Sequence, residues 1–230
     1  TTFIILILYI ISSFLMLFLP KAEVEVLESE TNLEILLKGW KLVARVHRLR
    51  LFVSANLLEI FSNTIWVSSI ILVFVTELLN ETESYWGYSN TAYSIGIIIS
   101  GLIAFRLSEK FLAAKWESIL FPLVAMAIVT LTILYFPNAQ IFLVFSALVG
   151  MLSQLKEVPE SVFLQETVEE NNLVNVYSVL EVISTLAFSV FVLLMSYITE
   201  SFGISISFWL SAICLMIEAI LIYIRRDYFK

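Results

Sequence analysis

The sequence predicts an all-α, polytopic membrane protein, and three observations carry this prediction. Of the 230 residues, 60% are hydrophobic and 14% are charged, and the mean hydropathy is +0.96. A soluble domain is closer to half apolar and a quarter charged. The apolar residues form runs of about the 20 residues that a helix needs to cross a bilayer. All basic residues fall outside these runs, in alternate connections and in the C-terminal tail.

Seven apolar runs are predicted as membrane spans. The chain starts with Thr1 rather than Met, so we expect a fragment or a cleaved product. The first run has no basic flank and no small-residue cleavage site, which argues against a signal peptide. The predicted spans cover residues 3–19, 51–76, 86–105, 119–136, 141–155, 173–198 and 204–224.

The distribution of Lys and Arg predicts the orientation, because these residues favour the cytoplasmic side of a membrane. With the C-terminus inside, all 13 Lys and Arg lie in inner segments and the outer loops carry none. We therefore expect a multi-pass protein of the cell membrane, with the N-terminus of this chain outside and its C-terminus cytoplasmic. The predicted inner segments are 20–50, 106–118, 156–172 and 225–230.

The predicted organisation has four parts. Residues 1–19 form one transmembrane helix, and residues 20–50 form a cytoplasmic loop. Residues 51–224 form a bundle of six spans, and residues 225–230 form a cytoplasmic tail. The loop contains an amphipathic stretch, which is either an interfacial helix near anionic lipid or a tethering linker. Its apolar residues are Leu33, Leu36, Leu37, Trp40 and Ala44.

Several classes of function are excluded or disfavoured. The net charge of −7 argues against a nucleic-acid partner, which requires a basic face. The single cysteine, Cys214, allows no intrachain disulfide and no cysteine-based metal cluster. No phosphate-binding GxxxxGK[ST] loop occurs. We expect no enzymatic activity, no cofactor and no bound metal.

A polar stripe in the second predicted span indicates a binding site. Asn56, Glu59, Asn63 and Trp66 share one helical face. Charges in hydrocarbon usually face a cavity or a partner, and no basic residue is expected beside Glu59. The stripe predicts substrate or proton binding in a water-accessible cavity. The alternative is a protonated Glu59 that only packs against a neighbouring helix.

The sixth predicted span carries a similar but weaker stripe of Ser178, Glu181, Thr185 and Ser189. Serine and threonine often bond only to their own helix, so Glu181 and Thr185 are the candidates here. Glu218, in the seventh predicted span, shares a face with Arg225 and is expected to reach toward the inner interface.

The third predicted span carries small residues at every fourth position. Such a ladder lets two helix backbones approach closely. We expect it to be a packing seam rather than a chemical site. The ladder consists of Ala92, Gly96, Ser100 and Ala104.

Receptor, rhodopsin and channel classes fit poorly. The last predicted span has no Lys for a retinal Schiff base, and no extracellular cysteine pair or DRY-like or NPxxY motif is present. A channel would need a filter-like loop or a ring of charges, and the short outer loops offer neither.

Three stretches resemble the major facilitator superfamily. GLIAFRLSEKF, residues 101–111, resembles its loop signature between the second and third helices of each half, with Arg106, Glu109 and Lys110 near the charged positions; the usual Gly-x-x-x-Asp core is degraded. LLKGWKLVARVHRLRLF, residues 36–52, and FLQETVEENNLVNVYSV, residues 163–179, resemble the approaches to the seventh and eleventh helices in drug- and macrolide-efflux members. The stretch 163–179 lacks the basic Arg-Gly-Arg-like segment that those members have before the eleventh helix.

The resemblance implies the C-terminal six-helix bundle of a transporter, preceded by its sixth helix. It implies a missing N-terminal half, against whose fifth helix the small-residue ladder would pack, and a gating role for the 106–110 loop. The implied function is proton-coupled export (antiport) of drug-like or amphiphilic small molecules, with the bilayer, a substrate and protons as partners. The alternative is a non-transporting membrane module that acts as a sensor or assembly partner.

Overall fold

The computed structural model describes residues 2–16, 18, 32–66, 68–113 and 115–229, and in these ranges the chain forms helices and short connections. Contacts divide it into two units, residues 1–34 and 35–230. The elements are α1 (Thr2–Met16), α2 (Asn32–Arg45), α3 (His47–Asn63), η1 (Thr64–Trp66), α4 (Ser68–Val73), η2 (Phe74–Leu78), α5 (Ser84–Ala113), α6 (Lys115–Tyr135), α7 (Ala139–Thr167), α8 (Glu170–Phe202), α9 (Ile204–Ile224) and η3 (Arg226–Tyr228).

Five of the described helices, α5 to α9, contain segments long and apolar enough to cross a membrane, and a bent pair could supply a sixth. This confirms the predicted class, a polytopic all-α membrane protein. The predicted last span, 204–224, coincides with α9. Within the first predicted span, 3–19, the described helix α1 has 15 residues, and residues 17 and 19 lie outside the described ranges.

The predicted second span, 51–76, is bent rather than straight. Its axis turns by 44° between the segments His47–Trp66 and Ile70–Leu78. At the bend, Thr64 donates its hydroxyl hydrogen to the carbonyl oxygen of Phe61 at 2.6 Å. A hydroxyl that bonds back to its own helix competes with the backbone ladder and often bends the helix.

Two predicted boundaries are wrong in the same direction. The predicted 106–118 loop is helical, because α5 runs on to Ala113 and α6 starts at Lys115. The predicted fifth span ended at residue 155, whereas α7 continues to Thr167. Polar residues had marked both ends, but Lys, Arg and Glu are good helix formers and do not by themselves end a helix. The extension of α7 keeps Lys156 inside the bundle.

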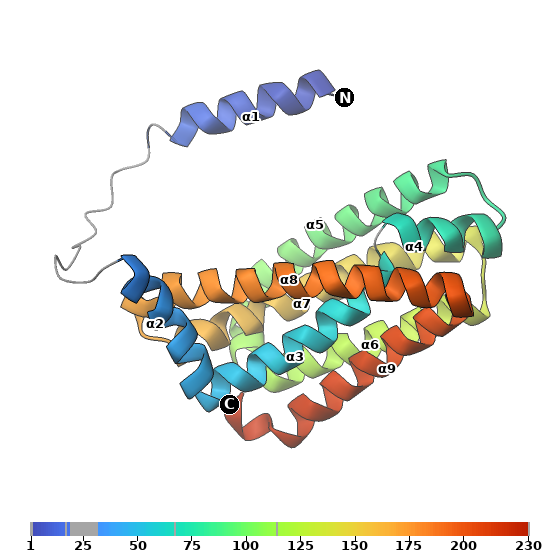
Figure 1. Ribbon diagram of the computed structural model, residues 1–230. Coiled ribbons are helices and arrows are strands. Elements are labelled where there is room, and N and C mark those ends of the chain that lie inside the picture. The colour runs from blue at the N-terminus through green and yellow to red at the C-terminus, as the bar shows by residue number, and fades with distance from the viewer. Residues whose placement is uncertain (1, 17, 19–31, 67, 114, 230) are drawn as a thin grey trace. The chain divides into compact units, whose positions relative to one another are not determined.

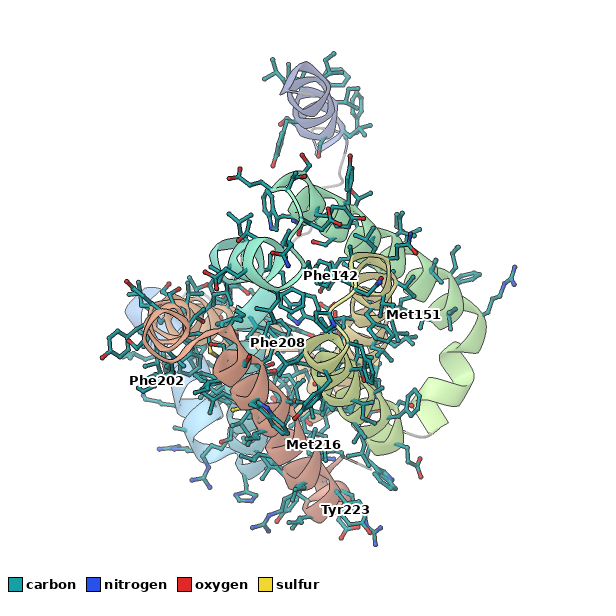
Figure 2. All side chains as sticks on the ribbon, turned by 90° about the vertical axis from the view of Figure 1, so that its right-hand side faces the viewer. Phe142, Met151, Phe202, Phe208, Met216 and Tyr223 are labelled. Atoms are coloured by element: carbon teal, nitrogen blue, oxygen red, sulfur yellow. The ribbon has the colours of Figure 1, made fainter. Side chains whose placement is uncertain are left out.

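Aromatic side chains fill the centre of the 35–230 unit. Figure 2 shows Phe142 and Phe208 among the helices, and both are buried. The ring of Phe74 lies 5.4 Å from that of Phe142 and 4.9 Å from that of Phe208. Phe202 and Tyr223 lie at the outside of the helices and are exposed. An apolar outer surface of this kind suits lipid rather than water.

The small-residue ladder packs within this bundle, so the prediction that it faces a missing half is wrong. A Cβ added at Gly96 on α5 would overlap the carbonyl oxygen of Ala147 on α7. A Cβ added at Gly150 on α7 would likewise overlap the carbonyl oxygen of Tyr93. The other ladder residues follow this contact: Ser100 and Ala104 are buried and Ala92 is half-buried.

The amphipathic stretch of the 20–50 segment forms α2. Its buried residues are Gly39 and Val43, and a Cβ at Gly39 would lie 2.5 Å from the carbonyl oxygen of Asn175 on α8. The predicted apolar face is instead open, since Leu37 and Trp40 are each 44% exposed. The side chains of Leu33 and Leu36 lie outside the described residues.

Candidate functional site

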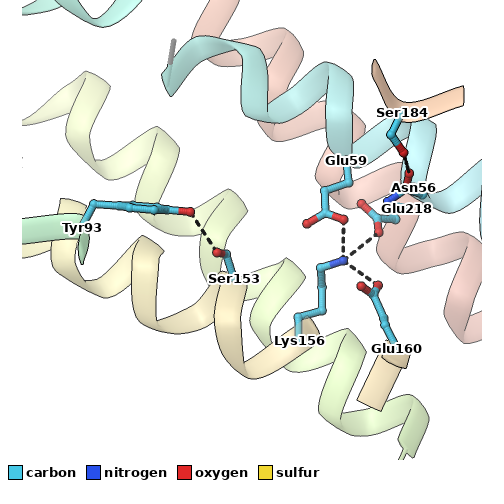
Figure 3. Close-up of polar contacts among 8 residues, drawn as sticks. All are labelled: Asn56, Glu59, Tyr93, Ser153, Lys156, Glu160, Ser184 and Glu218. Carbon is cyan, nitrogen blue, oxygen red and sulfur yellow. Dashed lines mark hydrogen bonds and ion pairs between the residues drawn. The ribbon is translucent and has the colours of Figure 1, made fainter. Parts of the chain in front are cut away.

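A lysine surrounded by three glutamates lies inside the bundle. Lys156 projects from α7 and is 1% exposed. Its Nζ lies 2.6 Å from Glu59 Oε2 on α3 and 2.6 Å from Glu160 Oε1 on α7 (Figure 3). It also lies 3.7 Å from Glu218 Oε1 on α9. We call these four residues the lysine–carboxylate cluster.

The cluster is formed by two residues on one face of α7 and by carboxylates that α3 and α9 contribute. Lys156 and Glu160 lie four residues apart and therefore on one face of α7. The helices α3 (cyan) and α9 (red) pack against each other and bring their carboxylates to this face (Figure 1). Ser62 on α3 and Ser211 on α9 hold that contact through hydroxyl groups 2.7 Å apart.

The charges of the cluster do not balance. One ammonium group faces three carboxyl groups whose oxygens lie within 4.8 Å of one another. Glu218 is fully buried, and neither of its oxygens has a hydrogen-bond partner. Three carboxyl groups so close could hold a metal ion, but the ammonium of Lys156 already supplies their cation. Buried charges persist only when they are paired, so one ammonium group is not enough to balance three ionised carboxyl groups.

A cavity of about 280 Å³ opens beside the cluster. Its walls carry neutral polar and aromatic groups. The hydroxyl oxygens of Tyr93 on α5 and Ser153 on α7 lie 3.1 Å apart at its wall (Figure 3). The lining residues are Asn63, Trp66, Ile71, Ser89, Asn90, Tyr93, Ser146, Val149, Ser153 and Phe188.

A second pocket, of about 380 Å³, adjoins the first and shares Asn63 and Phe188 with it. Glu181 and Thr185 of α8 line this pocket, together with Ile60 and Ser184. Glu181 is exposed, so the second pocket adds an accessible carboxylate to the neutral walls of the first.

The residues of the predicted polar stripe, which lie on α3 and η1, are found in three different surroundings. Asn56 accepts a hydrogen bond from Ser184 on α8 at 3.1 Å, and Glu59 joins the cluster. Asn63 and Trp66 line the cavity. The expectation that no basic residue accompanies Glu59 is wrong. Lys156 was assigned to an inner loop, whereas α7 carries it into the bundle.

Sequence reasoning missed Lys156 and Glu160 and misjudged Glu218. Glu218 does not reach the inner interface but is buried beside Lys156. One signal was available: Lys156 and Glu160 stand at the i, i+4 spacing directly after an unusually short apolar run. A span of normal length would have included both residues.

The predicted gating residues lie on the extended end of α5. Arg106 is exposed there. The side chains of Glu109 and Lys110 lie outside the described residues, so their gating role stays a prediction.

Apolar membrane-length helices around a buried ionic cluster define an integral, multi-pass membrane protein. The chain belongs to the Major Facilitator Superfamily, whose family model matches residues 52–230. It is similar to two proteins of Bacillus subtilis (strain 168). One is the "Uncharacterized MFS-type transporter YfmI", 26% identical over 185 residues, which cover 80% of this chain and 46% of that protein.

The other is the "Uncharacterized MFS-type transporter YjbB", 28% identical over 187 residues, which cover 81% of this chain and 46% of that protein. The chain thus spans about half the length of the curated relatives it matches. No solved structure matches it.

Proposed function

We propose that the chain is the C-terminal half of a secondary transporter that exports drug-like amphiphilic molecules in exchange for protons. The observation that carries this proposal is a charge-imbalanced cluster beside a neutral, partly aromatic cavity. In the proposed orientation the C-terminus is cytoplasmic, as the basic residues favour. Membership of a family that includes proteins named as transporters supports the same function.

Glu218 is the proposed proton carrier, in place of Glu59. Glu59 and Glu160 each accept a 2.6 Å hydrogen bond from Lys156, so these two share the single positive charge of the cluster. Glu218 lies farther from the ammonium, is fully buried and accepts no hydrogen bond. A proton on Glu218 therefore relieves the largest uncompensated charge in the cluster.

The two adjoining pockets form the proposed substrate site. Trp66, Tyr93 and Phe188 offer aromatic surface for an apolar ring system. Glu181 offers a carboxylate to a positively charged group in the second pocket. Because Lys156 already compensates Glu59, Glu181 is the better partner for the cation. This combination fits an aromatic, lipophilic cation.

Helices α3 and α7 connect the lysine–carboxylate cluster to the cavity over about one helical turn. On α3, Asn63 at the cavity lies four residues from Glu59 in the cluster. On α7, Ser153 at the cavity lies three residues from Lys156. A substrate that displaces these cavity residues acts on the cluster through one turn of each helix.

Substrate-induced proton release tests the proposal on the purified chain. Tetraphenylphosphonium, an aromatic lipophilic cation, is added in a weakly buffered detergent solution while binding and pH are recorded. We expect saturable binding with proton release. Glu218→Gln should abolish the release and keep the binding, whereas Glu181→Gln should weaken the binding. Glu77→Gln, an exposed carboxylate at the other end of the bundle, is the control and should change neither. Absence of binding, or binding without proton release, would contradict the proposal.

A further inference from the structure

A separate hollow of about 280 Å³ lies where α3 begins and α9 ends. It is lined by His47, Arg50, Leu51 and Ser54 from α3 and by Leu221 and Arg225 from the end of α9. None of these residues belongs to the lysine–carboxylate cluster or to the two substrate pockets. We call it the basic pocket.

Among the described residues, the positive charge of the basic pocket has no counter-ion. Arg50 and Arg225 are exposed, and among the described residues neither has a carboxylate within ion-pair distance. Arg50 Nη2 lies 3.3 Å from His47 Nδ1, a neutral or positively charged neighbour. No lining side chain is acidic. The pocket therefore attracts an anion.

The C-terminal residues fix the shape of this pocket. Arg48 donates a 2.8 Å hydrogen bond from Nε to the carbonyl oxygen of Tyr228. The ring of Phe229 is buried and stacks 4.7 Å from that of Phe163. The ring of His47 packs 5.1 Å from that of Tyr228. These contacts hold the end of α9, with Arg225, beside the first turn of α3.

An apolar stripe leads away from the basic pocket along α9. Ile213, Ile217, Leu221 and Ile224 follow at helical spacings of four, four and three residues and share one face. Ile213 and Ile217 are each 47% exposed and Ile224 is 67% exposed. Leu221 belongs to both the stripe and the pocket, so a ligand with a charged head and an apolar tail can occupy both at once.

We propose that the basic pocket binds the phosphate group of an anionic membrane lipid, with an acyl chain along the α9 stripe. Guanidinium groups match phosphate oxygens in a bidentate geometry. Basic pockets between transmembrane helices near the membrane surface are suited to anionic headgroups. Inorganic phosphate shares the headgroup chemistry, but it makes no use of the apolar wall formed by Leu51, Leu221 and the stripe. The proposal does not depend on the transport function.

Native mass spectrometry of the purified chain in detergent tests this site, with phosphatidylglycerol as the probe. The test variant is Arg50→Gln/Arg225→Gln. The matched control is Lys41→Gln/Arg106→Gln, which removes the same charge from two exposed residues outside the pocket. All four side chains are exposed, so both variants should fold, which thermal unfolding verifies.

We expect the test variant to bind phosphatidylglycerol about tenfold more weakly, as the loss of charged hydrogen bonds implies. The control should bind it as the parent chain does. Zwitterionic phosphatidylcholine should bind more weakly than phosphatidylglycerol, and excess inorganic phosphate should not displace the lipid. Equal losses in both variants would overturn the proposed site. Displacement by inorganic phosphate would overturn the assignment to a lipid.

Discussion

Lys156 Nζ and Glu59 Oε2, on α7 and α3, lie 2.6 Å apart inside the bundle, where the lysine is 1% exposed. This ion pair links two helices that are distant in the sequence. Lys156 is also the only cation in contact with Glu160 and Glu218 among the described residues. Removal of Lys156 would leave three carboxyl groups without a cation. The effect of a substitution on the free energy of unfolding should therefore depend on which residue of the cluster is replaced.

Lys156→Met should destabilise the bundle by about 3–5 kcal/mol, because breaking a buried ion pair leaves uncompensated charge. The free energy of unfolding in detergent, followed by circular dichroism, measures the effect. Adding Glu59→Gln to Lys156→Met should recover part of the loss, since it removes one of the stranded charges. Lys41→Met, at an exposed residue of α2, is the control. A loss no larger than that of the control would show that the ion pairs do not support the fold.

Glu218→Gln and Glu160→Gln should differ in their effect on stability near neutral pH. Glutamine mimics the protonated form of a carboxyl group, and Glu218 accepts no hydrogen bond that the change would break. Its replacement should leave the free energy of unfolding nearly unchanged. Glu160 accepts a 2.6 Å bond from Lys156, so its replacement should cost about 1.5–3 kcal/mol, as for other bonds to charged groups. Equal losses would argue against a proton on Glu218.

Gly96→Ala should disrupt the contact between α5 and α7. The added Cβ would overlap the carbonyl oxygen of Ala147, and backbone cannot move aside as a flexible side chain can. We expect a loss of about 3 kcal/mol or more in the free energy of unfolding, at the upper end for overpacking. Gly101→Ala is the matched control on the same helix, since its Cβ would meet nothing within 4 Å. It should leave the stability unchanged or slightly raised. Similar behaviour of the two variants would contradict the close approach.

Hydropathy predicted the class of this protein and most of its helices. The apolar run 204–224 matches α9. The runs 86–105, 119–136, 141–155 and 173–198 fall on α5 to α8, with one residue beyond the end of α6, and the run 51–76 falls on α3, η1, α4 and η2. The ends of α5 and α7 were placed too early because polarity was taken to mark the membrane surface. Polarity does not end a helix when partners cover it: Lys156 and Glu160 continue α7 among the carboxylates of α3 and α9.

The candidate site was predicted only in part, for a related reason. Helical spacing placed Asn63 and Trp66 on one face, and both line the cavity. Spacing within one helix cannot reveal the partner that another helix supplies, so the pairing of Glu59 with Lys156 was missed. The ladder on α5 was recognised as a packing seam. Its partner was taken from the family resemblance as a helix of the missing half, whereas Gly150 and Ala147 of α7 lie against it.

The last prediction concerns transport by this chain alone. Alternating access in this superfamily uses two bundles that rock around a shared site, and the chain spans about half the length of its matched relatives. We therefore expect tetraphenylphosphonium to bind but not to be transported. Liposomes that contain only the 230-residue chain, with an imposed pH gradient, should show uptake no greater than liposomes that contain the Glu218→Gln variant. Saturable uptake that follows the gradient and disappears in that variant would contradict the expectation, unless cross-linking in the same liposomes shows that two copies have formed the second bundle.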